Sequence, residues 1–77
     1  MTEEQLQTLK NNIWDAGKLL GFIGECINDS FTFDKKDVGS DEVWFIEYKD
    51  TTYKLHIIRA IRGNGKEGLE VKDIIVK

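Results

Sequence analysis

The chain contains no proline, one cysteine and one histidine among its 77 residues. A single cysteine cannot form a disulfide within the chain, and with a single histidine it cannot supply the four ligands of a structural zinc site. Hydrophobic runs are also short, because none approaches the roughly 18 apolar residues of a membrane-spanning helix. The sequence therefore predicts a domain that is held together by its hydrophobic core alone and does not span a membrane.

A secretory signal and a strong basic excess are missing as well. The N-terminal segment MTEEQLQTLKNN is polar and acidic, so we expect no export and a cytoplasmic protein. The formal charge is −3, from 14 acidic and 11 basic side chains. The first 42 residues carry nine acids and four bases, and the last 35 carry five acids and seven bases. The first half therefore presents an acidic surface, which favours a basic target over nucleic acid.

Composition predicts a small folded domain. With 40% hydrophobic and 32% charged residues, the chain should fold as one domain spanning residues 1–77. A domain of this length buries only about 60% of the surface that its unfolded chain exposes, so its core is thin. Small domains often complete a thin core by associating with a second copy.

Residues 2–29 carry the pattern of an amphipathic helix, with a capping box formed by Thr2 and Gln5 at its start. Apolar residues follow at spacings of three and four, namely Leu6, Leu9, Ile13, Ala16, Leu20, Ile23 and Ile27. Gly17, Gly21 and Gly24 interrupt this helix, and each costs about 1 kcal/mol relative to alanine. They indicate either a close approach of another backbone to a continuous helix or a break near Gly17 or Gly21.

The rest of the chain predicts an antiparallel meander. β-Branched and aromatic runs separated by turn residues are expected to form strands over 42–49, 52–62 and 69–76. Residues 30–35 are a candidate for a further short strand, which would make four. The expected fold class is therefore α+β, with the N-terminal helix packed on one face of a three- to four-stranded antiparallel meander sheet.

Cross-strand pairing predicts which residues share a face of this sheet. A two-residue turn at Asp50 and Thr51 places Trp44 opposite Ile57, and a loop over 64–68 places Ile58 opposite Ile74. The face expected beneath the helix carries Trp44, Ile46, Tyr48, Tyr53, Leu55, Ile57, Ile61, Val71 and Ile75. The opposite face, called the second face below, is expected to carry Val43, Phe45, His56, Ile58, Ala60, Ile74 and Val76.

One helix can cover only one face, so the apolar residues of the second face need another explanation. Burying an aliphatic or aromatic side chain contributes roughly 1.5–3 kcal/mol to stability. A patch of six such residues is therefore expected to be covered and not to face water. The cover is half of a broken helix, the same face of a second copy in a homodimer, or a different macromolecule. The homodimer is favoured, and these seven residues are the candidate protein interface.

No segment predicts a catalytic, metal-binding or cofactor-binding site. Gly63–Gly68 (GNGKEG) matches the glycine pattern of a dinucleotide-binding loop, but a strand pattern follows where that site needs a helix, so we predict a hairpin loop. Cys26 lies near the C-terminal end of the helix, where the dipole disfavours a thiolate. The acidic stretch between residues 34 and 42 lacks the ligand spacing of a calcium loop and predicts a solvated loop.

Nucleic acid is the alternative partner. Basic residues of the second half accompany aromatic ones, a combination that suits single strands; they are Lys54, Arg59, Arg62, Lys66 and Lys72, with Trp44, Phe45, Tyr48 and Tyr53. These bases are divided between the two predicted faces and diluted by acids, so this alternative ranks second.

In style the chain resembles the small, acidic, cysteine-poor α+β accessory proteins of phages and mobile elements, many of which inhibit a host enzyme stoichiometrically. The resemblance implies a non-enzymatic intracellular interaction module that inhibits a host protein by binding and occlusion. The alternatives are a β-hairpin module that binds single-stranded nucleic acid and a structural homodimer.

Overall fold

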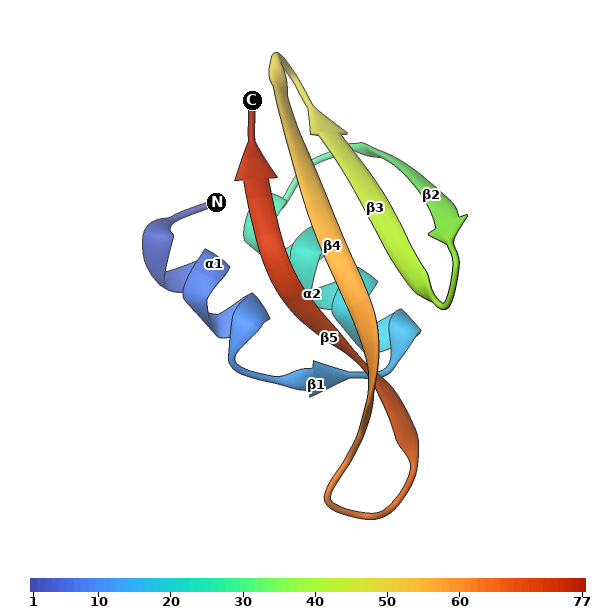
Figure 1. The fold of residues 1–77 in the computed structure, drawn as a ribbon. Helices are drawn as coiled ribbons and strands as arrows, with labels where there is room; N and C mark the ends of the chain where they lie inside the picture. Colours follow the sequence, from blue (N-terminus) through green and yellow to red (C-terminus); the bar gives the residue numbers. More distant parts are fainter.

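The computed structural model describes residues 1–77 and shows two short helices and a five-stranded antiparallel sheet (Figure 1). The elements in chain order are α1 (Glu3–Lys10), β1 (Ile13–Trp14), α2 (Ala16–Ile27), β2 (Thr32–Val38), β3 (Asp41–Tyr48), β4 (Thr51–Ile61) and β5 (Glu67–Val76). Strands β2 to β5 form the expected meander, and β1 adds to the free side of β5, giving the order β1-β5-β4-β3-β2. The predicted α+β class is confirmed, with one or two more strands than expected.

The N-terminal region forms two helices and not one. The capping box is present, because the Gln5 amide donates to Thr2 Oγ1 at 3.1 Å and the Thr2 amide donates to Gln5 Oε1 at 2.9 Å. Helix α1 ends at Lys10, where the Trp14 indole donates to the carbonyl oxygen of Leu9 at 3.0 Å. The chain between the helices then pairs with β5 as β1, which a continuous helix over 2–29 would prevent.

The break lies before the three glycines, and no backbone approaches them closely. A Cβ atom at Gly17 or Gly21 would meet nothing within 4 Å, and one at Gly24 would meet the Phe31 ring at an ordinary 3.6 Å. The alternative of a break that gives two short helices is confirmed, and the break ends at Asp15, two residues before Gly17. The expectation that another backbone approaches these glycines closely is wrong.

Replacing Gly21 by alanine is expected to raise the free energy of unfolding by about 1 kcal/mol, because Gly21 lies inside α2 beside open space. Urea denaturation followed by far-ultraviolet circular dichroism measures the change. Gly39→Ala is the matched control: its site is equally open, but its φ of +66° should make alanine destabilising. A loss of stability in Gly21→Ala would contradict the open surroundings of this glycine.

Both helices pack on one side of the sheet, and α2 crosses behind β4 and β5 in the view of Figure 1. The core lies between these layers. Its buried side chains come from α1 (Leu9), α2 (Leu19 and Ile23) and the three strands β3, β4 and β5 (Trp44, Ile46, Tyr53, Leu55, Ile57, Leu69 and Val71). The core is thin, as the length of the chain predicts.

The β3–β4 hairpin differs from the prediction by one position in its turn. Lys49 and Asp50 form the two-residue turn, and Lys49 has a φ of +54°. Trp44 therefore pairs with Leu55 and not with Ile57. Because side chains alternate with a period of two, this shift of two residues leaves every side chain of the hairpin on its predicted face.

The β4–β5 hairpin carries a bulge that changes the facing of its last residues. Ile57 pairs with Val71, but His56 pairs with Asp73, so Lys72 is an extra residue in β5. Beyond the bulge Leu55 pairs with Ile74. One inserted residue inverts the facing of everything that follows it, so the predicted pairing of Ile58 with Ile74 is wrong.

The glycine-rich segment joins β4 to β5, as predicted. Ile61 pairs with Glu67, and the Arg62 amide donates to the carbonyl oxygen of Lys66 at 2.8 Å. Gly65 supplies the positive φ of the loop, at +81°. A strand follows this loop where a dinucleotide-binding site needs a helix, so a hairpin loop is confirmed. The loop is shorter than predicted, because Glu67 and Gly68 already belong to β5 and pair with Ile61 and Ala60.

Candidate interaction surface

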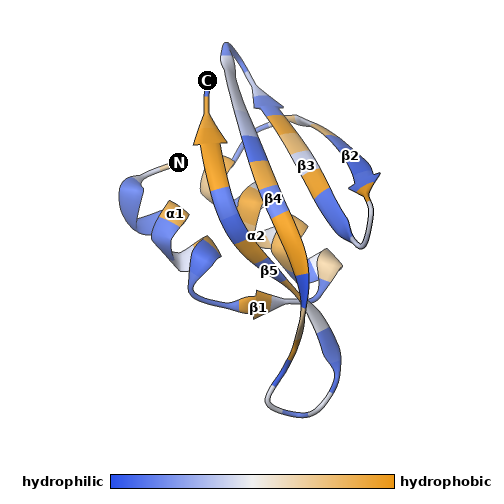
Figure 2. Cartoon of the chain, in the orientation of Figure 1, coloured by the Kyte–Doolittle hydropathy of each residue, from blue (hydrophilic) through white to orange (hydrophobic).

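The second face of the sheet has no helix over it. Helices α1 and α2 both contribute to the core on the opposite side, and β2 to β5 present the second face towards the viewer in Figure 1. Figure 2 shows hydrophobic and hydrophilic residues in alternating blocks along β3 and β4. The idea that half of a broken helix wraps round the sheet is therefore wrong, since both halves lie on the same side.

Five of the seven predicted interface residues lie on the second face. Their facing follows from the pairing of β3 with β4, and all five are half-buried; they are Val43, Phe45, His56, Ile58 and Ala60. Ile74 and Val76 are corrections, because the bulge turns them to the helix side, opposite Leu55 and Tyr53. Ile75 takes their place on the second face, pairs with Lys54 and is 47% exposed.

Charged residues interrupt the apolar ones in the two central rows across the second face. One row runs Lys36, Val43, His56 and Asp73, and the next runs Asp34, Phe45, Lys54 and Ile75. The predicted continuous row of Val43, Ile58 and Ile74 does not exist. The surface is a mosaic in which long charged side chains lie between apolar ones, as in interfaces between proteins that also exist apart.

His56 lies within this mosaic and not between Phe45 and Val76 as predicted. Its Nε2 atom is 3.1 Å from Asp41 Oδ2, and Asp73 is its cross-strand partner on β5. Beside it the surface is hollowed by about 280 Å³, in a depression lined by Val38, Val43, Lys54, His56, Asp73 and Ile75. The hollow gives the second face an apolar floor with both signs of charge at its rim.

A second polar cluster surrounds Glu42 on the helix side of the sheet. Glu42 is 7% exposed, and its Oε1 atom accepts hydrogen bonds from Trp44 Nε1 at 3.1 Å and from Lys35 Nζ at 3.4 Å. Arg59 Nη2 lies 4.0 Å from Oε2. The indole hydrogen bond, with help from both cations, lowers the pKa of Glu42 below its ordinary value although burial opposes this.

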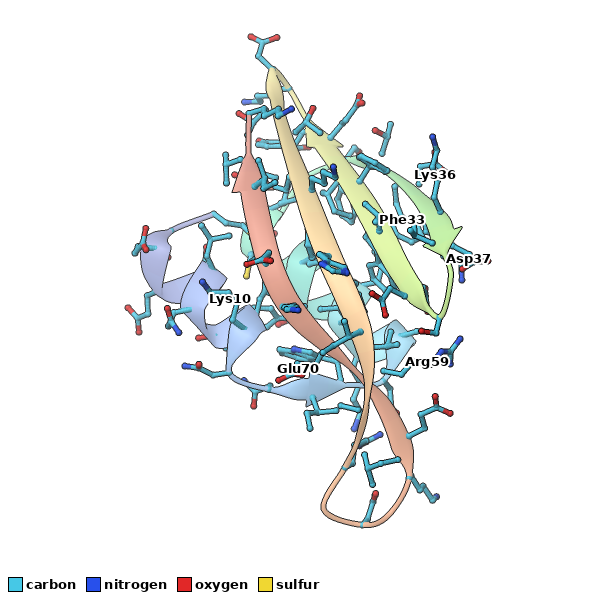
Figure 3. All side chains as sticks on the ribbon, viewed as in Figure 1. Lys10, Phe33, Lys36, Asp37, Arg59 and Glu70 are labelled. Carbon is cyan, nitrogen blue, oxygen red and sulfur yellow. The ribbon has the colours of Figure 1, made fainter.

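The Glu42 cluster connects three strands near the start of α2. Lys35 comes from β2, Glu42 and Trp44 from β3, and Arg59 from β4. Arg59, labelled in Figure 3, also pairs with Glu67 at 3.3 Å. A depression of about 270 Å³ lies between this cluster and the start of α2. Every cation of the cluster is paired with a carboxylate, so the arrangement fastens β2, β3 and β4 together.

Sequence reasoning missed this cluster. The sequence predicts Glu42 at the start of the strand over 42–49, which is confirmed, but also as part of a solvated acidic loop, which is wrong because its side chain is buried. The available signal was the spacing of two residues between Glu42 and Trp44, which places a carboxylate and an indole donor on the same face of a strand. Asp34 and Asp37, by contrast, are exposed on β2.

Four of the nine residues that suggested nucleic acid are buried in the core or paired with carboxylates. Trp44 and Tyr53 are buried in the core, so their rings offer no stacking platform. Arg59 pairs with Glu67, and Arg62 pairs with Asp15. Phe45 is the one of the four aromatic residues that lies half-buried on the second face between charged neighbours.

Neither His56 nor Cys26 belongs to a cluster of metal-ligating residues. The structure contains no group of three or more histidine, cysteine, aspartate or glutamate side chains placed to hold a metal ion. Burial raises the pKa of the Cys26 thiol, which is half-buried near the end of α2. Neither α1 nor α2 has the length and apolar character needed to cross a membrane.

Comparison of the chain with protein-family models, with curated proteins and with solved structures gave no match.

Proposed function

We propose that this protein is a non-enzymatic module that binds another protein through the second face of its sheet and acts by occluding the surface that it covers. The observation that carries the proposal is a rigid sheet face with no helix over it, on which half-buried apolar side chains alternate with charges. A binding surface needs fixed positions for its contacts, and β3 and β4, which are paired on both sides, supply them for Phe45 and Ile58.

The chemistry of the second face defines the partner. Phe45, Ile58 and Ile75 offer apolar anchors, and an aromatic side chain near the centre of a surface commonly contributes most to binding. Lys54 and Asp73 flank them with opposite charges. The partner therefore presents an apolar patch with charges of both signs around it, and the acidic first half of the chain favours a target with a basic margin.

The test is affinity capture from the native host with three forms of the full chain: wild type, Phe45→Glu and Ile61→Glu. Ile61→Glu is the matched control, because it also replaces an apolar side chain by an acid. Ile61 is 69% exposed and lies on the helix side, away from the second face. We expect one protein to be recovered stoichiometrically by wild type and Ile61→Glu and lost with Phe45→Glu. Circular dichroism checks that all three forms fold.

Three results would count against the proposal. A captured protein that Phe45→Glu still binds would place the interaction elsewhere. Recovery of nuclease-sensitive material in place of a protein would favour the nucleic-acid alternative. If the captured species is a second copy of this chain and is lost with Phe45→Glu, the result would favour a homodimer through the second face over occlusion of a different protein.

A further inference from the structure

Strand β2 forms one edge of the sheet, and no strand pairs with the side of β2 that faces away from β3. β2 pairs with β3 on one side only, and all seven of its residues are exposed. Figure 1 shows β2 at one margin of the sheet, away from both helices, and Figure 3 shows Lys36 and Asp37 along this margin. An unpaired strand presents a row of backbone donors and acceptors that another strand can use.

Backbone direction on β2 is indicated by one hydrogen bond. The amide of Lys35 donates to Oδ1 of Asp34 at 2.9 Å, so this amide is not directed into the ladder with β3. Backbone groups of alternate residues point to the same side of an antiparallel strand. Phe33, Lys35 and Asp37 therefore direct their donors and acceptors to the free edge.

The sequence of β2, Thr-Phe-Asp-Lys-Lys-Asp-Val, is complementary to itself when it runs antiparallel about Lys35. In that alignment Thr32 meets Val38 of the second copy, so the whole strand overlaps. Asp34 meets Lys36 of the second copy and Lys36 meets Asp34, which gives two opposite-charge pairs on the second face. Neither Asp34 nor Lys36 forms an ion pair within its own chain.

We propose that two copies of this protein pair through β2, antiparallel and centred on Lys35, to form one continuous sheet. Phe33 and Asp37 of each copy exchange backbone hydrogen bonds with Asp37 and Phe33 of the other, and the two Lys35 residues exchange theirs on the two-fold axis. The amide of Lys35 then leaves Asp34 for the second copy, which frees the Asp34 carboxylate to meet Lys36.

Charges on an edge strand usually prevent such pairing, and the pattern of β2 removes that obstacle. The two Lys35 side chains meet on the helix side, but each is already held at 3.4 Å by the buried Glu42 of its own chain. The charges on the second face are complementary and not alike. An unrelated strand would lack this match, so the pattern specifies a second copy as the occupant.

Edge pairing leaves the second face of both copies uncovered and on the same side of the joined sheet, since residues paired across strands share a face. The inference is independent of the proposed function, although it would double the area of the second face. A single pair of strands buries little surface, so we expect a weak, concentration-dependent dimer.

The test is sedimentation equilibrium of the full chain over a range of concentrations, with Asp34→Lys and Lys36→Asp as variants. Each variant alone sets like charges opposite each other twice, and we expect its dissociation constant to rise about tenfold or more. An equimolar mixture of the two variants restores both opposite-charge pairs and should dimerise, as should the double variant Asp34→Lys/Lys36→Asp. Circular dichroism should be unchanged throughout, because both residues are exposed.

The outcomes separate this inference from the proposed function. A wild-type chain that stays monomeric at its highest soluble concentration would overturn edge pairing and leave the protein-binding proposal standing. A dimer that Asp34→Lys does not weaken, or variants that do not dimerise when mixed, would also overturn it. Ile58→Glu, on the second face, should leave the mass unchanged; loss of the dimer in this variant would place the contact on that face and contradict edge pairing.

Discussion

Replacing Leu55 by alanine is expected to lower the free energy of unfolding by about 3 kcal/mol, the usual cost of deleting a buried leucine side chain. Leu55 is 0% exposed and lies in the central strand β4, where it pairs with Trp44 on one side and Ile74 on the other. The layer beneath it contains Leu19 and Ile23 of α2. Because the core is one thin layer, little can move to fill the space that the side chain leaves.

Urea denaturation of the full chain measures this effect, with Lys54→Ala as the control. Lys54 is the neighbour of Leu55 on β4, faces the second face and is exposed, so its truncation should change stability by less than about 0.5 kcal/mol. A domain of this size has a total stability of roughly 4–11 kcal/mol, so Leu55→Ala removes a large share. Equal effects of the two substitutions would contradict the placement of the core on the helix side alone.

Replacing Glu42 by alanine is expected to cost about 2–3 kcal/mol, the second-largest effect among these predictions. The substitution leaves the buried indole N–H of Trp44 without its acceptor and leaves Lys35 without its partner. Glu42→Gln is the matched control, because its side-chain oxygen still accepts from the indole while the charge is lost. We expect it to cost about 1 kcal/mol, since Lys35 and Arg59 are more than half exposed and solvated.

The same carboxylate makes stability depend on pH. The pKa of Glu42 in the folded protein is lower than in the unfolded chain, so the unfolded state binds the proton more readily. Its contribution is therefore fully present above about pH 5 and is lost as the pH falls through about 4 and below. Glu42→Gln should lack this component, so the stability difference between wild type and Glu42→Gln should shrink on acidification. A difference that stays constant from neutral pH to pH 3 would contradict the account of Glu42.

The facing of the β3–β4 hairpin could be predicted from the sequence although its pairing could not. The turn lies one residue earlier than expected, at Lys49 and Asp50, and every pair moves by two residues. The alternation of hydrophobic residues shows only which positions share a face of the strand. A shift of two residues in the pairing leaves every side chain on the same face, so the alternation cannot reveal it and the core is unchanged.

The facing of the last strand was predicted wrongly because of one inserted residue. Lys72 and Asp73 are adjacent polar residues, followed by Ile74, and this interruption of the period of two is the local sign of a bulge. Cross-strand chemistry alone favoured an unbroken ladder, which placed Ile74 and Val76 on the second face. A bulge depends on how the strand packs against the helices. A comparison of opposite residues on two strands does not take that packing into account.

The break between the helices had a signal that the apolar stripe concealed. Asn11 and Asn12 are weak helix formers, and Asp15 stands at the start of α2 as a capping residue would. Ile13 continues the three-four spacing of the stripe, but it lies on β1 and is 38% exposed. Periodicity therefore identified Leu9 and Ile23 as buried positions without identifying the break between the two helices.

The central claim is that the second face is open in solution while the helix face is sealed, and methyl NMR with a soluble paramagnetic agent tests it most directly. We predict strong broadening of the methyl signals of Val43, Ile58 and Ile75 and little broadening of those of Leu19 and Ile23. This holds for a monomer and for an edge-paired dimer alike. Protection of the Val43, Ile58 and Ile75 methyls to the level of Leu19 would show that the second face is covered and would contradict the account.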